Sequence, residues 1–244
     1  MFPNNPSPPL FSPEGRLYEV EHAMEEVAKA APSVAILAED GIAVAAIQED
    51  LFPLMAKQSA LGHIFRVDHD NACAVTGIMT DGFKLVSVMS TYSQRHRRAY
   101  GELMPTERLV ENICRKKQSY TMYTGKRPFG IAVIYMGWDS ERGWQIYHSD
   151  PSGNYGRWKS SCIGRHAHRA QEYLDQMLVG KPLPSLSLAN ELAIKAIKVA
   201  MEGIQLTGSA IQMATMQRNR TVTKFHTVAD SVVQDLYNLH CAGP

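Results

Sequence analysis

The chain lacks three features that would place it in other protein classes. Its first residues have neither the basic flank nor the apolar core of a secretory signal peptide. No stretch approaches the roughly 18 consecutive apolar residues that span a membrane. It also has almost no net charge, with 25 Lys and Arg against 24 Asp and Glu. We therefore expect a protein of the cytoplasm and nucleus, with no general affinity for nucleic acid or membrane.

Cysteines are few and widely spaced. The four, Cys73, Cys114, Cys162 and Cys241, form no C-x-x-C pair and have no ligand spacing with histidine. This pattern predicts buried or bystander thiols in a reducing compartment, rather than a disulfide framework or a zinc site.

Several catalytic and cofactor motifs are also absent from the sequence. There is no G-x-S-x-G, H-E-x-x-H, Walker A or G-x-G-x-x-G motif, so we expect no cofactor and no metal. His166 and His168 are two residues apart, which does not put them on one helix face. Residues 68–70 (Asp-His-Asp) are interpreted as a turn. Residues 95–98 (Arg-His-Arg-Arg) are interpreted as a solvated helix end or a subunit contact, rather than a nuclear-import or nucleic-acid patch.

Proline concentrates at the N-terminus, where residues 1–10 read MFPNNPSPPL. Such a segment cannot be helical and has little to bury, so we predict a mobile tail over residues 1–10. No later Pro/Gly/Ser-rich run is long enough to link two domains. The remainder, residues 11–244, is predicted to be a single domain.

The pattern of apolar residues predicts ten strands and six helices. Strands are expected at residues 33–37, 42–47, 63–67, 72–76, 130–137, 144–149, 155–158, 160–163, 211–217 and 221–225. Helices are expected at 19–30, through 85–92, from 105 through 114, and at 166–177, 187–201 and 228–239. Strand pairs that alternate with helix pairs indicate an α+β fold, with two stacked antiparallel sheets covered by helices outside.

Three motifs, in order, carry a family resemblance. Residues 11–27 read FSPEGRLYEVEHAMEEV, residues 125–130 read GKRPFG, and residues 149–164 read SDPSGNYGRWKSSCIG. Together they resemble the α-type subunits of the proteasome core particle, most of all the alpha-type-4 group. The likeness extends from residue 11 to about residue 240.

The resemblance implies a fold, a function and a set of partners. The fold is the four-layer α-β-β-α sandwich of N-terminal-nucleophile hydrolases. The function is that of a non-catalytic structural subunit in protein degradation, both ubiquitin-dependent and independent. Partners would be other α subunits in a seven-membered ring, β subunits below, and a regulatory particle or other activators that insert C-terminal tails. An alternative is a paralogue that forms homomeric rings with a scaffold role.

The family's proteolytic chemistry belongs to certain β subunits, which use an N-terminal Thr with an Asp and a Lys. By alignment, the corresponding positions here hold Ala31, Ile47 and His63. The mechanism needs a chain-terminal Thr whose own amine can act as base, and alanine has no nucleophilic group. The resemblance therefore implies a non-enzymatic chain, and it argues against a self-processing threonine hydrolase of the same fold.

Two further sites follow from the resemblance. The pore-gate and turn residues correspond to Pro13, Gly15, Arg16 and His22, with His22 in place of the usual Tyr. The usual gate Tyr-Asp pair falls on residues 4–6 (Asn-Asn-Pro), so only Pro13 remains of the customary contact cluster.

A family lysine that binds the carboxylate of activator tails corresponds to His63. Lysine is charged at physiological pH, whereas histidine is mostly neutral at pH 7 and has one N–H to donate. The alternative for His63 is a plain strand-end role.

Overall fold

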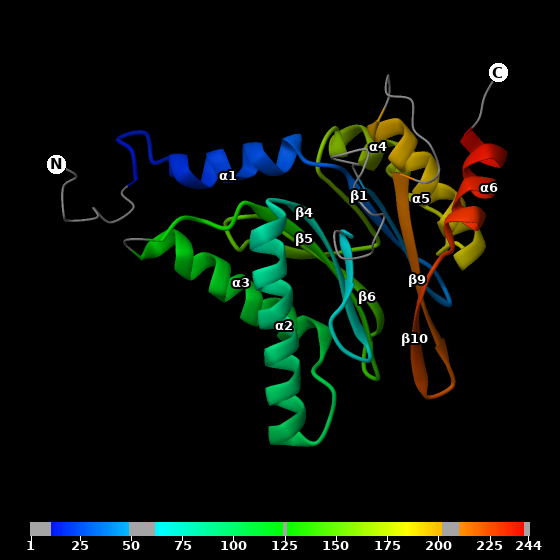
Figure 1. The fold of residues 1–244 in the computed structure, drawn as a ribbon, viewed down its shortest axis with the longest axis horizontal. Coiled ribbons are helices and arrows are strands. Elements are labelled where there is room, and N and C mark those ends of the chain that lie inside the picture. The colour runs from blue at the N-terminus through cyan, green and yellow to red at the C-terminus, as the bar shows by residue number, and fades with distance from the viewer. Residues whose placement is uncertain (1–10, 49–61, 124–125, 202–209, 242–244) are drawn as a thin grey trace, which may run out of the picture.

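The computed structural model describes residues 11–48, 62–123, 126–201 and 210–241. Within these ranges the chain forms two five-stranded antiparallel sheets (Figure 1). The first has the strand order β10-β9-β2-β1-β8, and the second has the order β3-β4-β5-β6-β7. The predicted α+β fold is confirmed. The expected tail over residues 1–10 lies outside the described residues.

The strands of the first sheet are β1 (Ser33–Leu37), β2 (Gly41–Ile47), β8 (Ser160–Ile163), β9 (Ile211–Asn219) and β10 (Val222–Thr227). Those of the second are β3 (Ile64–Arg66), β4 (Asn71–Gly77), β5 (Ile131–Asp139), β6 (Gly143–Ser149) and β7 (Tyr155–Trp158). Each expected strand is present, with ends that differ by at most two residues.

Helices cover the outer face of each sheet (Figure 1). The six are α1 (Tyr18–Lys29), α2 (Met79–Tyr100), α3 (Thr106–Met122), α4 (Ala167–Leu178), α5 (Leu186–Ala200) and α6 (Asp230–Cys241). Helices α4, α5 and α6 pack on the first sheet, and α2 and α3 pack on the second. The layers therefore run helix, sheet, sheet, helix. Helix α1 lies across the end of this sandwich and contacts β4 and β5.

Strand β2 shows why its sequence is apolar at consecutive positions. Ala43, Ala45 and Ile47 face the core beneath the helices, whereas Ile42 and Val44 face the core between the sheets. Side chains alternate across a strand, so both alternating sets must be apolar when both faces are covered.

Helix α5 lies close to the first sheet because small side chains line its inner side. Ala189, Ala193, Ala196 and Ala200 are all fully buried, as their spacing predicted. The helix contacts β1 and β2.

The starts of α2 and α3 differ from the sequence prediction. Pro105 was expected as the first helical residue, but it is the N-cap of α3. Helix α2 begins at Met79, one and a half turns before the periodic residues that predicted it, and ends where Gly101 takes φ +76°. Its extra first turn includes buried Asp81, which binds Arg127 at 2.6 Å.

Cys73, Cys114 and Cys162 are buried free thiols, as expected. In the described residues, no helix is long and apolar enough to cross a membrane.

Candidate functional site

A tight turn leads the chain into α1. The Ser12 amide donates to the Arg16 carbonyl at 2.8 Å, and the Gly15 amide donates to the Ser12 carbonyl at 2.8 Å. Gly15 has φ +79°, a conformation that glycine adopts at little cost. Pro13 lies exposed within this turn. The predicted turn chemistry of residues 12–15 is therefore present.

Arg16 fastens the turn to the helix. Its Nε and Nη2 donate to Glu21 Oε1 and Oε2 at 2.7 and 2.6 Å, a two-pronged contact. The hydrogen bond from Arg16 is the main reason that the pKa of Glu21 is lowered. His22 is exposed on the same helix, near enough to Glu21 to add a smaller effect of the same sign on that pKa. Among the described residues, no hydrogen bond joins His22 to Pro13 or Gly15.

His63 lies immediately before β3 and is nearly buried, with 9% of its surface exposed. Its Nδ1 lies 3.0 Å from the Val75 carbonyl oxygen. A carbonyl only accepts, so Nδ1 carries the proton, and Nε2 is the unprotonated nitrogen of the neutral ring. The single N–H that neutral imidazole could offer a ligand is thus already given to the protein.

The positions aligned with the hydrolytic residues gather at one end of the sheets. The Ile47 amide donates to the Pro32 carbonyl, next to Ala31, at 3.0 Å. The His63 amide donates to Gln212 Oε1 at 2.8 Å, and Gln212 pairs with Ala46, the neighbour of Ile47. Ala31 and Ile47 are both almost fully buried. The topology has brought the three positions together, but two of the three side chains are aliphatic.

The chain that precedes Ala31 is held in place by the loop after β8. Arg165 donates its amide to the Ala30 carbonyl at 2.8 Å and its Nη2 to the Lys29 carbonyl at 2.9 Å. Gly164 lies so close that a Cβ there would be 2.8 Å from the Ala31 carbonyl oxygen. The end of α1 is thus fixed over position 31, whose nitrogen is an internal amide.

The sequence interpretation missed a buried lysine. Lys117 Nζ donates to Ser149 Oγ at 2.8 Å, to the Asp150 carbonyl at 3.0 Å and to the Ile131 carbonyl at 3.1 Å. Burial lowers its pKa from 10.5 to about 8. All three ammonium protons have acceptors, so Lys117 ties α3 to β5 and to the turn after β6. Its position, three residues after Cys114 on the apolar helix face, was the available signal.

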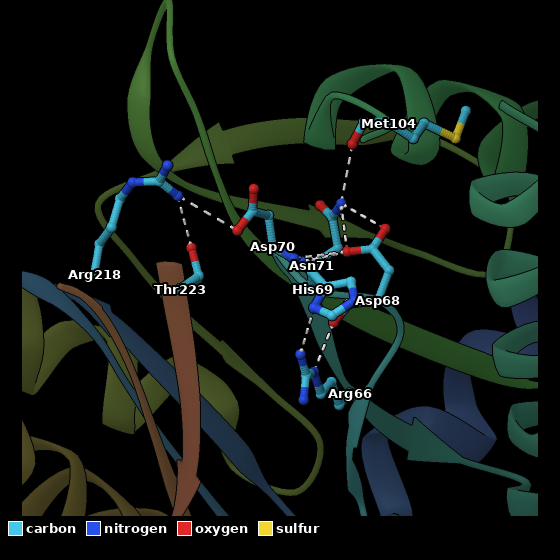
Figure 2. A network of polar contacts seen from close by, with 8 residues as sticks. All are labelled: Arg66, Asp68, His69, Asp70, Asn71, Met104, Arg218 and Thr223. Atoms are coloured by element: carbon cyan, nitrogen blue, oxygen red, sulfur yellow. Dashed lines mark hydrogen bonds and ion pairs between the residues drawn. The ribbon is translucent and has the colours of Figure 1, made fainter. Parts of the chain in front are cut away.

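The turn at residues 68–70, which the sequence predicted, is the centre of a polar network (Figure 2). Asp68 Oδ1 accepts from the amides of Asp70 and Asn71 at 2.8 and 2.7 Å. Arg218 of β9 reaches Asp70 from the other sheet at 3.4 Å. Arg66 of β3 donates to the Asp68 carbonyl at 2.8 Å. The turn therefore joins both sheets.

His166 and His168 are both exposed. Across the described ranges, no group of three or more His, Cys, Asp or Glu side chains is placed to hold a metal ion.

Known proteins share this chain's sequence over most of its length. The family model described as proteasome subunit matches residues 27–216. Proteasome subunit alpha type-4 of Drosophila melanogaster is 45% identical over 217 residues, 87% of this chain and 82% of that protein. Proteasome subunit alpha type-4-like of the same organism is 39% identical over 93% of this chain and 91% of its own length. Proteasome subunit alpha type-4-A of Arabidopsis thaliana is 38% identical over 89% of this chain and 86% of its own length.

Proposed function

The chain belongs to the proteasome subunit family, and from this we propose that it is a non-catalytic ring subunit of the proteasome core particle. The observation that carries the proposal is the alignment with alpha type-4 subunits over more than four fifths of both chains. An α-type proteasome subunit assembles with other proteasome subunits. Those subunits are therefore its partners.

The chemistry at the aligned positions supports a non-catalytic role. The mechanism needs a chain-terminal Thr, whose hydroxyl attacks while its own amine acts as base. Position 31 holds an alanine inside the chain, and its nitrogen is bonded to Ala30. Ile47 has no carboxylate to orient or activate a nucleophile, and His63 is engaged with Val75.

Finer parts of the role are proposals as well. We place the chain in the outer, seven-membered α ring, with β subunits beneath it, in the cytoplasm and nucleus, where ubiquitin-dependent and independent degradation take place. Its N-terminal region contributes to the pore gate. The turn at Pro13 and Gly15 supports this because Arg16 holds it against the start of α1.

Native mass spectrometry of the tagged chain, purified from its source, tests the proposal. We expect a particle in which one or two copies of this chain occur with several homologous subunits. The homomeric alternative predicts a ring that contains only this chain, and such a ring would overturn the proposal. In the same experiment, the separated chain should cleave no fluorogenic peptide. Turnover that a threonine-directed inhibitor abolishes would contradict the non-catalytic role.

A further inference from the structure

Two sequence clusters that looked unrelated line one depression on the surface. Residues 66–69 come from the end of β3 and the turn after it, and residues 93, 94 and 97 come from α2. Leu103, from the loop after α2, completes the lining. The depression has a volume of about 370 Å³, within the range of small-ligand sites.

The turn side of this depression presents oriented N–H groups. Arg66 Nη2 lies 3.2 Å from His69 Nδ1, and its Nε donates to the Asp68 carbonyl (Figure 2). A guanidinium only donates, so His69 Nδ1 must accept. The proton of the neutral His69 ring is therefore on Nε2, the nitrogen that is left to donate. The contact with His69 and the Asp68 carbonyl also holds the Arg66 guanidinium in place.

The helix side adds a second guanidinium. Arg97 is exposed, and in the described parts of the chain its side chain has no carboxylate partner. Gln94 lies one turn earlier on α2 and contributes an amide that can donate. Donors thus come from two elements that meet at the depression.

The one acidic side chain of the lining is already saturated. Asp68 Oδ1 accepts from two backbone amides, and Oδ2 accepts from Asn71 Nδ2 at 3.0 Å and from the Ser93 hydroxyl. The Asp68 carboxylate is thus bonded to the turn and to α2. The lining contains two guanidinium groups and only this one carboxylate, so its net charge is positive.

We propose that this depression binds the phosphate group of a phosphomonoester. The donors of Arg66, His69, Gln94 and Arg97 outnumber the two oxygens of a carboxylate but suit the three terminal oxygens of a phosphate. Guanidinium groups match these oxygens in pairs. The volume and the apolar Val67 and Leu103 leave space for the group that carries the phosphate. Two sources share this chemistry, a phosphorylated side chain and a small phosphorylated metabolite.

The test is calorimetric titration of the full chain with inorganic phosphate and with phosphoserine amide, at constant ionic strength. Each should bind saturably. Arg97→Gln should weaken binding by roughly tenfold, since a hydrogen bond to a charged group contributes about 1.5 kcal/mol or more. Arg97→Lys keeps the charge but lacks the paired donors, so its affinity should lie between those of the wild type and Arg97→Gln. Arg98→Gln is the matched control, because Arg98 is exposed on the same helix and does not line the depression.

The two ligands separate the two sources. Tighter binding of phosphoserine amide than of phosphate indicates a phosphorylated protein segment, and equal affinities indicate a small phosphorylated ligand. No saturable binding of either, or an equal loss in Arg98→Gln and Arg97→Gln with unchanged melting temperatures, would overturn the proposal. The assembly role does not depend on this site, so its failure would leave that role intact.

Discussion

Lys117 should make the fold more stable at alkaline pH than at neutral pH. Its pKa is about 8 in the folded chain and near 10.5 when solvated. Between these values the unfolded chain binds a proton that the folded chain lacks. Stability rises with pH wherever the unfolded state binds more protons, so this residue should stabilise the fold progressively from pH 8 to 10.5. The buried charge carries its full cost only below pH 8.

We expect Lys117→Met to remove this rise. The difference in the free energy of unfolding between wild type and variant should grow by up to about 3 kcal/mol from pH 8 to 10.5, at ~1.4 kcal/mol per pKa unit. Comparing wild type with variant removes the contribution of other titrating groups to the pH dependence, such as Cys73, whose pKa burial raises to about 12. Urea unfolding across this range measures it. Lys116→Met, one residue earlier on α3, is the control, and a flat difference for Lys117→Met would refute the coupling.

His63 leads to a prediction about activator tails, which depends on the expectation from the resemblance that such tails dock beside this residue. Its Nδ1 proton is donated to Val75, and protonation of the ring would add a positive charge that attracts an incoming carboxylate. Tail-peptide affinity for assembled core particles should therefore be higher at pH 6 than at pH 8. His63→Lys should remove this dependence and strengthen binding at neutral pH. Identical curves for the two particles would show that His63 does not contact the tail.

Among the elements, the β9–β10 hairpin contacts the opposite sheet through the side chain of Arg218. The Arg218 guanidinium carbon lies 3.4 Å from the centre of the Trp138 ring of β5. Its Nη1 donates to Thr223 Oγ1 at 3.0 Å and reaches Asp70 at 3.4 Å. Arg218 is only 20% exposed, so these contacts are poorly screened by solvent. They connect the first sheet to the second at the end that carries the polar turn (Figure 2).

We expect Arg218→Met to loosen this hairpin selectively. The substitution keeps the apolar length but removes the charge and the donors, at a cost of roughly 1–2 kcal/mol. Hydrogen exchange of amides in β9 and β10 should accelerate by about tenfold, while exchange in β1 stays unchanged. Lys224→Met, an exposed change on β10, should leave all three strands as they are. Unchanged protection in Arg218→Met would show that the ring contact and the ion pair do not hold the hairpin.

The sequence predicted elements better than contacts between elements. Local periodicity predicted the strands around residues 33–47 and the alanine side of α5. Each spacing of apolar residues places them on the buried face of only one kind of element. The partners of Lys117 and Arg218 come from segments far apart in the chain, and so do Arg66 and His69, which line the depression with Arg97. No local pattern encodes which distant carbonyl or ring a charged side chain will meet. The candidate phosphate site was therefore visible in the sequence only as two separate polar clusters.

At the scale of the whole molecule, three apolar cores within the described residues separate four layers, and α1 lies outside this stack. One core lies beneath each helical layer, and one lies between the sheets. Helix α1 instead crosses the end at which the hydrolytic positions gather, and it places a buried alanine at the first of them. In the proposed non-catalytic role, α1 covers the position that aligns with the nucleophile.

The two hydrogen bonds from Arg165 to the end of α1 also affect how the chain would respond to a pulling force. A pull on the N-terminal region passes along α1 to Lys29 and Ala30, whose carbonyls are held by Arg165. From there the tension divides between β1, which follows α1, and the loop after β8. Strands β1 and β8 are neighbours in one sheet, paired through residues such as Val34 and Cys162. The load is then shared by two neighbouring strands. The turn at Gly15 should therefore yield well before the junction at residue 30.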